Sequence, residues 1–272
     1  MAQPTERHVA RTRRHPAGSF TIDPSAHRYA YLSQRPLYVL VFLLPLIAVF
    51  EIGASTAHIT HTIRAHKGLS EFFNWFGAGG LHVPAILTVV VLLVWHVLSS
   101  DRWRIRSSVL AGMVLECVAW TAPLLVLGLI LKRALGLDGG VAAPPAAAIA
   151  GAATAAGGTY PAWFAPLAMA LGAGVYEEVL FRLVGMALVH IAVVDVGGFS
   201  DLAGKVTGVI VTSLLFAGYH QVMGPAGIDW PLATYYFAAG VYFGIVYLAR
   251  GLGIAVGVHA LYDVVVLLRP FG

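Results

Sequence analysis

Eight apolar segments that follow one another along the chain constrain its fold more than any other feature. They lie near residues 36–53, 81–99, 109–131, 161–181, 183–197, 206–221, 232–249 and 252–268. A helix needs roughly 20 residues to cross the apolar core of a bilayer, and most of these segments approach that length. The pattern therefore predicts an all-α, polytopic transmembrane helix bundle of about eight spans, with a buried polar cavity.

The composition agrees with a membrane protein. Lys, Arg, Asp and Glu make up only 11% of the 272 residues, and hydrophobic residues make up 58%. A soluble domain usually carries about 25% charged residues. The single cysteine, Cys117, lies in an apolar run, which excludes a disulfide-stabilised secreted scaffold. The net charge of +4 is small, so we expect a lipid bilayer and no nucleic acid as the partner.

Charged and flexible residues divide the chain into three parts. Residues 1–35 form a polar tail that holds six of the 17 basic residues, residues 36–160 hold the first spans, and residues 161–272 form the core helices. The basic tail predicts a cytoplasmic N-terminus, and the three arginines of residues 101–106 agree with it. The Ala/Gly/Pro-rich residues 132–160 predict an exoplasmic linker. We expect an integral multi-pass protein of the bacterial plasma membrane.

Two adjacent glutamates in the fourth segment are the first functional signal, because a charge inside a bilayer is costly. Glu178 and Arg182 lie four positions apart and share one face of a helix, so the spacing predicts an ion pair. Glu177 is rotated by about 100° from Glu178 and has no such partner. A buried carboxylate without a nearby cation is suited to act as a general base.

The later segments add two histidines and an aspartate. His220 ends the sixth segment in the pattern Phe216-x-x-x-His220. His259 and Asp263 lie four positions apart in the eighth segment, so they share a helix face. Asp263 is therefore expected to orient His259, to hold a water with it, or to bind a metal with it.

The order of the spans predicts that these groups converge. In a chain of eight spans with a cytoplasmic N-terminus, the fourth, sixth and eighth spans run in the same direction. Their functional residues then lie in the cytoplasmic half of the membrane. This reasoning requires residues 183–197 to form a short fifth span of their own.

A carboxylate, two histidines and an aspartate together suit a hydrolase. Two histidines can hold Zn²⁺ or another divalent metal, or they can hydrogen-bond the attacking water and the developing oxyanion directly. Both the metal hypothesis and the metal-free hypothesis stay open. The metal ligands would be Glu177, His220, His259 and Asp263.

Three motifs carry a resemblance to a known family. Glu-Glu-x-x-x-Arg at 177–182, Phe-x-x-x-His at 216–220 and His-x-x-x-Asp at 259–263 resemble the CPBP family, the CAAX protease and bacteriocin-processing family, also called Abi. Residues 237–259 are similar to its last two helices, and the resemblance covers about 161–268. It implies a glutamic-type intramembrane endopeptidase that hydrolyses a peptide bond near the C-terminal tail of a membrane-anchored or prenylated protein or peptide.

The resemblance also implies roles for individual residues. Glu177 would activate the water, and His220 and His259 would hold the water or a metal. The last motif position is commonly Asn in the prenyl-protein endopeptidases, and the charge of Asp263 favours a metalloprotease over a specifically CAAX-type enzyme. The implied catalytic set is Glu177, Glu178, His220, His259 and Asp263, with Arg182 and Phe216 as structural support.

Two other functions compete with the protease. A non-catalytic membrane scaffold of the same fold would bind a peptide tail without cleaving it. An ion-coupled transporter would use Glu51 and Glu116, in the first and third segments, as a relay with the core acids. A transporter predicts internal repeats, and the sequence shows none.

Overall fold

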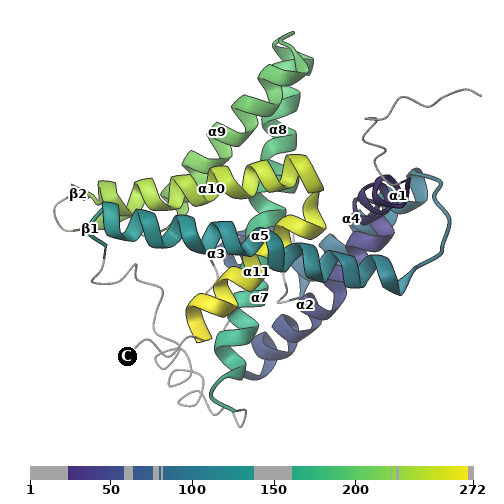
Figure 1. Cartoon of the computed structure of the whole chain (residues 1–272), viewed down its shortest axis with the longest axis horizontal. Helices are drawn as coiled ribbons and strands as arrows, with labels where there is room; N and C mark the ends of the chain where they lie inside the picture. The colour runs from purple at the N-terminus through teal and green to yellow at the C-terminus, as the bar shows by residue number, and fades with distance from the viewer. Residues whose placement is uncertain are drawn as a thin grey trace, which may run out of the picture.

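Helices make up almost all of the described structure, a computed structural model shown in Figure 1. It describes residues 24–57, 64–75, 80, 82–137, 161–220, 222–224 and 227–268, so most of the expected linker 132–160 lies outside it. The elements are α1 (Pro24–Ser33), α2 (Pro36–Ala57), α3 (Arg64–Trp75), α4 (Val83–Leu98), α5 (Ser107–Ala134), α7 (Phe164–Glu178), η2 (Val179–Gly185), α8 (Met186–His190), η3 (Ile191–Val196), α9 (Asp201–Tyr219), β1 (Met223–Gly224), β2 (Gly227–Ile228), α10 (Trp230–Arg250) and α11 (Leu252–Leu268).

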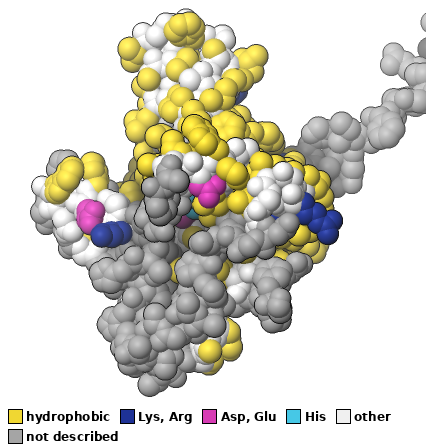
Figure 2. Space-filling view, turned by 90° about the vertical axis from the view of Figure 1, so that its left-hand side faces the viewer, with side chains coloured by type: hydrophobic (Ala, Val, Ile, Leu, Met, Phe, Trp, Pro, Cys, Tyr) yellow, Lys and Arg dark blue, Asp and Glu magenta, His cyan; other side chains and the backbone are white. Residues whose placement is uncertain are grey.

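Among the described residues, five helices are long and apolar enough to cross a membrane. They are Pro36–Thr56, Ser107–Ala134, Phe164–Val196, Asp201–Tyr219 and Trp230–Arg250. Two shorter apolar helices, Val83–Leu98 and Leu252–Leu267, accompany them. Large hydrophobic side chains are exposed on these helices. Hydrophobic side chains of all sizes cover much of the described part of the face in Figure 2. The all-α membrane bundle predicted from the sequence is confirmed.

The fourth and fifth apolar segments form one continuous helical rod, so the prediction of a separate span at 183–197 was wrong. The rod runs over 33 residues, Phe164–Val196, through α7, η2, α8 and η3. The charges of residues 177–182 interrupt the apolar sequence, but their side chains are buried and the helical backbone continues past them. The rod ends at two glycines, and Gly198 has a left-handed φ of +70° that ends the helix.

Helix α9 returns along the second half of this rod, and the two project together from the body in Figure 1. A β-carbon at Gly204 would lie 2.8 Å from the His190 ring, and one at Gly208 would lie 3.6 Å from Met186. The register is therefore antiparallel, with the start of α9 beside the end of the rod. This return, and not a fifth crossing, brings His220 back to the level of the end of α7.

Close backbone contacts join the central helices. A β-carbon at Gly174 of α7 would lie only 2.7 Å from the backbone nitrogen of Ala260 in α11. A β-carbon at Gly240 of α10 would lie 3.0 Å from Ser213 of α9. Small residues at such crossings let helices pack closely in a membrane. The α7–α11 crossing sets His259 beside the end of α7.

A helix lies within residues 1–35, where the sequence predicts a polar tail. This is α1, and the Tyr29 hydroxyl donates a hydrogen bond of 2.6 Å to Glu116 Oε2 in α5. The guanidinium of Arg250 in α10 pairs with the same carboxylate. Helix α1 is thereby tied to two core helices, whereas residues 1–23 lie outside the described part of the chain.

Candidate active site

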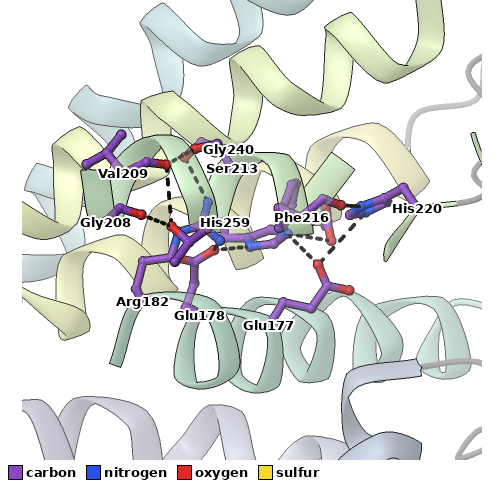
Figure 3. Close-up of polar contacts among 12 residues, drawn as sticks. Glu177, Glu178, Arg182, Gly208, Val209, Ser213, Phe216, His220, Gly240 and His259 are labelled. Carbon is purple, nitrogen blue, oxygen red and sulfur yellow. Dashed lines mark hydrogen bonds and ion pairs between the residues drawn. The ribbon is translucent and has the colours of Figure 1, made fainter. Parts of the chain in front are cut away.

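Three side chains from distant parts of the chain face one another in Figure 3: Glu177 of α7, His220 directly after α9, and His259 of α11. Glu177 Oε2 lies 3.9 Å from His220 Nε2 and 3.8 Å from His259 Nε2. Glu177 is only 6% exposed, and within the described residues its Oε2 atom has no hydrogen-bond partner. These separations exceed a direct hydrogen bond and suit bridging by a small molecule such as water. A carboxylate and two imidazoles can thus act on one molecule.

The adjacent glutamates at the end of α7 point in different directions, because successive helical residues are rotated by about 100°. Glu177 faces the two histidines. Glu178 is fully buried, and its Oε1 atom lies 3.1 Å from Arg182 Nη1 and 2.7 Å from His259 Nδ1. The two carboxylates therefore have different surroundings although they are neighbours in the sequence.

Glu178 fixes the orientation of His259. A carboxylate beside a guanidinium is an acceptor, so His259 donates from Nδ1 to Glu178 and turns Nε2 toward Glu177. Asp263 Oδ2 lies 3.6 Å from the same Nε2. Asp263 was expected to orient His259. The residue that holds Nδ1 of the ring is Glu178 instead, and Asp263 lies near Nε2.

His220 is held in a similar way. Its Nδ1 atom lies 2.8 Å from the carbonyl oxygen of Phe216, which can only accept, so Nδ1 carries the proton. The Nε2 atom then points toward Glu177. The ring also stacks on Tyr236, with centroids 3.9 Å apart and planes 20° from parallel. Both histidines therefore present Nε2 to Glu177 while Nδ1 is bonded on the other side.

Arg182 is enclosed beneath the site. Its Nη1 atom faces Glu178 at 3.1 Å without the alignment of a hydrogen bond, so this contact is an ion pair. Its Nη2 atom donates to the carbonyl oxygen of Gly240 at 2.9 Å. The guanidinium carbon lies 4.7 Å and 5.3 Å from the ring centroids of Phe216 and Phe243. The Glu178–Arg182 pair predicted from the spacing is confirmed.

The sequence did not predict that two aromatic residues of α10 contact the site. Tyr236 stacks on His220, and Phe243 stacks on His259 with centroids 4.4 Å apart and planes 17° from parallel. Aromatic side chains are common on apolar helices, so nothing in the sequence alone distinguishes these two. Each restricts the rotation of one histidine ring.

The side chains of the described residues are not arranged as a ready metal site. Among the residues that the structure describes, no group of three or more His, Cys, Asp or Glu side chains is arranged to hold a metal ion. The four side chains that the metal hypothesis invokes are neighbours at 3.6–3.9 Å. The donor atoms of a tetrahedral zinc site, each about 2.0–2.2 Å from the ion, lie roughly 3.3–3.6 Å from one another, so small shifts would bring these groups onto one ion.

Two other membrane-embedded acids lie in separate clusters. Glu51 Oε1 accepts a hydrogen bond of 2.6 Å from Tyr176, and its Oε2 pairs with His82. Glu116 is paired with Arg250. Each carboxylate thus has close polar partners of its own. The chain of acids that a transporter relay requires is not formed by these two residues.

A comparison with known families matches the later part of the chain. Residues 159–265 match the model described as type II CAAX prenyl endopeptidase Rce1-like. No curated protein and no solved structure was found to match the chain. The matched residues include the whole cluster around Glu177, and the resemblance to the CAAX protease family predicted from the three motifs is confirmed for this part of the chain.

Proposed function

We propose that this chain, which carries an Rce1-like CAAX protease core in residues 159–265, is an intramembrane endopeptidase with Glu177 as its general base. The observation that carries the proposal is the position of Glu177 Oε2. It is buried, has no hydrogen-bond partner among the described residues, and faces Nε2 of two histidines, one directly after α9 and one in α11. Such an arrangement suits a water that must be held and deprotonated inside an apolar bundle.

The proposed reaction is hydrolysis of a peptide bond. Glu177 takes one proton from a water held between it and the histidine Nε2 atoms, and the water oxygen forms a bond to the scissile carbonyl carbon. An Nε2 atom of His220 or His259 is unprotonated because Nδ1 carries the ring proton, so it accepts the other hydrogen of the water and holds the water beside Glu177. Glu177 then passes the proton to the leaving nitrogen as the C–N bond breaks.

The surrounding residues keep this geometry in place. Glu178 and the Phe216 carbonyl each accept a hydrogen bond from one histidine Nδ1, so both rings are fixed before a substrate enters. Arg182 compensates the charge of Glu178 in the apolar interior. Glu178, Arg182 and Phe216 therefore act as positioning residues in this proposal, and Asp263 lies close enough to Nε2 of His259 to bind the water as well.

The substrate proposed is a membrane-anchored or prenylated protein or peptide that is cut near its C-terminal tail. Support comes from the matched family, whose description names a CAAX prenyl endopeptidase, and from the position of the site among apolar helices. We also propose that the N-terminus is cytoplasmic, because six basic residues lie in residues 1–35.

Glu177→Gln tests the proposal, because glutamine keeps the shape of the side chain but cannot take the proton. Turnover of a membrane-anchored peptide panel in proteoliposomes should fall at least about a hundredfold, the usual contribution of a positioned base. The matched control is Glu71→Gln, which removes an exposed carboxylate of α3. Near-normal cleavage by the purified Glu177→Gln protein would refute Glu177 as the base.

The same assay distinguishes the alternatives. Loss of activity in a chelator and its return with Zn²⁺ would support a divalent metal cofactor, whereas full activity in chelator would support a water held by Glu177 and the histidines. A wild-type protein that binds the peptides but cleaves none of them would support the non-catalytic scaffold.

A further inference from the structure

The loop that joins α4 to α5 carries an uncompensated positive charge. Residues 101–106 are Asp-Arg-Trp-Arg-Ile-Arg, and the one acid among them, Asp101, is paired with Arg35 at the start of α2. The three arginine side chains of this loop are exposed, and they are Arg102, Arg104 and Arg106. Among the described residues, no carboxylate lies within ion-pair distance of these three guanidinium groups. The loop therefore has the charge to bind an anion from outside the chain.

Contacts with neighbouring residues hold this loop in one conformation. Ser100 has a φ of +51°, in the left-handed region that residues with a side chain rarely adopt, and such strain persists only where the surrounding structure maintains it. The next residue, Asp101, is tied to Arg35. The ring of Trp103 meets the ring of the buried His96 edge to face, with centroids 4.4 Å apart. The exposed arginines therefore belong to an ordered loop.

Apolar side chains alternate with the arginines along the loop. Trp103 is 64% exposed and Ile105 is 40% exposed. Helix α4 ends in two more exposed apolar side chains, Val97 and Leu98, directly before the loop. Tryptophan is enriched where the apolar core of a membrane meets the lipid headgroups, and arginine extends its charge into the headgroup layer. The loop therefore presents charge and apolar area together at the boundary of the membrane.

We propose that this loop binds the headgroup of an anionic phospholipid. The three arginines surround its phosphate, to which a guanidinium donates two parallel N–H groups, while Trp103 and Ile105 lie beside its acyl chains. A lipid matches both kinds of side chain, whereas a soluble acidic peptide would leave the apolar ones uncovered. The loop lies outside residues 159–265, so this binding site belongs to the first helices of the chain and is independent of the proposed catalysis.

Lipids with brominated acyl chains test this assignment, because bromine quenches the fluorescence of a tryptophan that it contacts. The full chain is placed in mixed micelles with brominated phosphatidylglycerol, which is anionic, or brominated phosphatidylcholine, which is zwitterionic. The chain has six tryptophans, so the signal of Trp103 is the difference between the wild-type protein and Trp103→Phe. Half-maximal quenching of Trp103 should need at least about tenfold less phosphatidylglycerol than phosphatidylcholine, and added salt should reduce this preference.

Replacement of all three arginines by glutamine should remove the preference and leave the quenching by phosphatidylcholine as it was. An arginine near an anionic surface contributes roughly fivefold, so Arg104→Gln alone should lower the preference by about that factor, and it gives the answer if the triple variant does not fold. The matched control is Lys132→Gln/Arg133→Gln, which removes two basic side chains at the other end of α5 and should keep the preference.

Three results would overturn the proposal. The first is equal quenching of Trp103 by the two lipids. The second is an unchanged preference in the arginine variants. The third is displacement of the lipid by an equal concentration of glycerol phosphate or of a polyglutamate peptide, because the apolar side chains of the loop would then contribute nothing to binding.

Discussion

Replacing Arg182 by methionine measures how much the buried ion pair beneath the site contributes to stability. The side chains of Arg182 and Glu178 have no exposed area. Arg182→Met leaves the Glu178 carboxylate in an apolar core, and the loss of one partner of a buried pair costs roughly 3–5 kcal/mol. The guanidinium also lies 4.7 Å from the Phe216 ring, a contact that contributes up to about 2 kcal/mol when desolvated. We therefore expect the free energy of unfolding to fall by roughly 4–6 kcal/mol.

The double variant Glu178→Gln/Arg182→Met separates charge from packing. With both charges removed, no carboxylate is left uncompensated, so at least half of the lost stability should return. The two substitutions should then show a coupling energy of about 2–3 kcal/mol in a double-mutant cycle. Activity should recover less than stability, because a neutral amide holds the Nδ1–H of His259 less strongly than a carboxylate does.

Unfolding in mixed micelles, followed by tryptophan fluorescence, would give these free energies. The matched control is Lys67→Met, which breaks the exposed pair of Lys67 with Glu71 at the same spacing of four residues. An exposed pair of this kind contributes only about 0.3–0.5 kcal/mol. If Arg182→Met were no more destabilising than Lys67→Met, or if the double variant showed simple additivity, the ion-pair reasoning would be wrong.

Two further predictions concern the helix crossing and the last motif position. Gly174→Ala should destabilise the protein by about 1–3 kcal/mol, because its β-carbon would lie 2.7 Å from the backbone of Ala260. The control Gly218→Ala meets nothing within 4 Å and lies in a helix, so it should keep the unfolding midpoint or raise it slightly. Asp263→Asn should lower kcat by less than about tenfold, because the Nδ1 atom of His259 is held by the buried glutamate of α7 and not by Asp263. If the kcat of Asp263→Asn were as low as that of Glu177→Gln, the charge of Asp263 would take part in the reaction.

The parts of the site that the sequence predicted are those governed by local geometry. Glu178 and Arg182 are four residues apart on one helix, so their pairing follows from the helical repeat alone. The same repeat predicts that Glu177 points elsewhere. Hydropathy likewise predicted the membrane helices, because a bilayer of fixed thickness needs a helix with apolar residues over a fixed length.

The parts that the sequence could not predict depend on contacts between distant segments. Glu178 and His259 are 81 positions apart, so no spacing rule connects them. The four-residue spacing of His259 and Asp263 predicted Asp263 as the partner that orients the imidazole ring. Both carboxylates contact the ring, but Glu178 holds Nδ1 and Asp263 lies near Nε2. The sequence also did not predict the single rod over Phe164–Val196, because charged residues end an apolar run in the sequence without ending a helix. Whether these charged side chains are buried depends on neighbouring helices, which a hydropathy profile does not describe.

In the proposed mechanism the site needs two adjacent glutamates, because one carboxylate cannot both position His259 and take a proton from water. A carboxylate that fixes His259 from behind must remain charged in an apolar core, and Arg182 provides the compensating charge at 3.1 Å. A carboxylate that takes a proton from water must instead lack such a cation, since an ion pair would weaken it as a base. The helical rotation of about 100° between neighbours separates the two environments: Glu178 turns toward Arg182, and Glu177 turns toward the histidine Nε2 atoms. One helix end can therefore supply both the base and the residue that positions its partner.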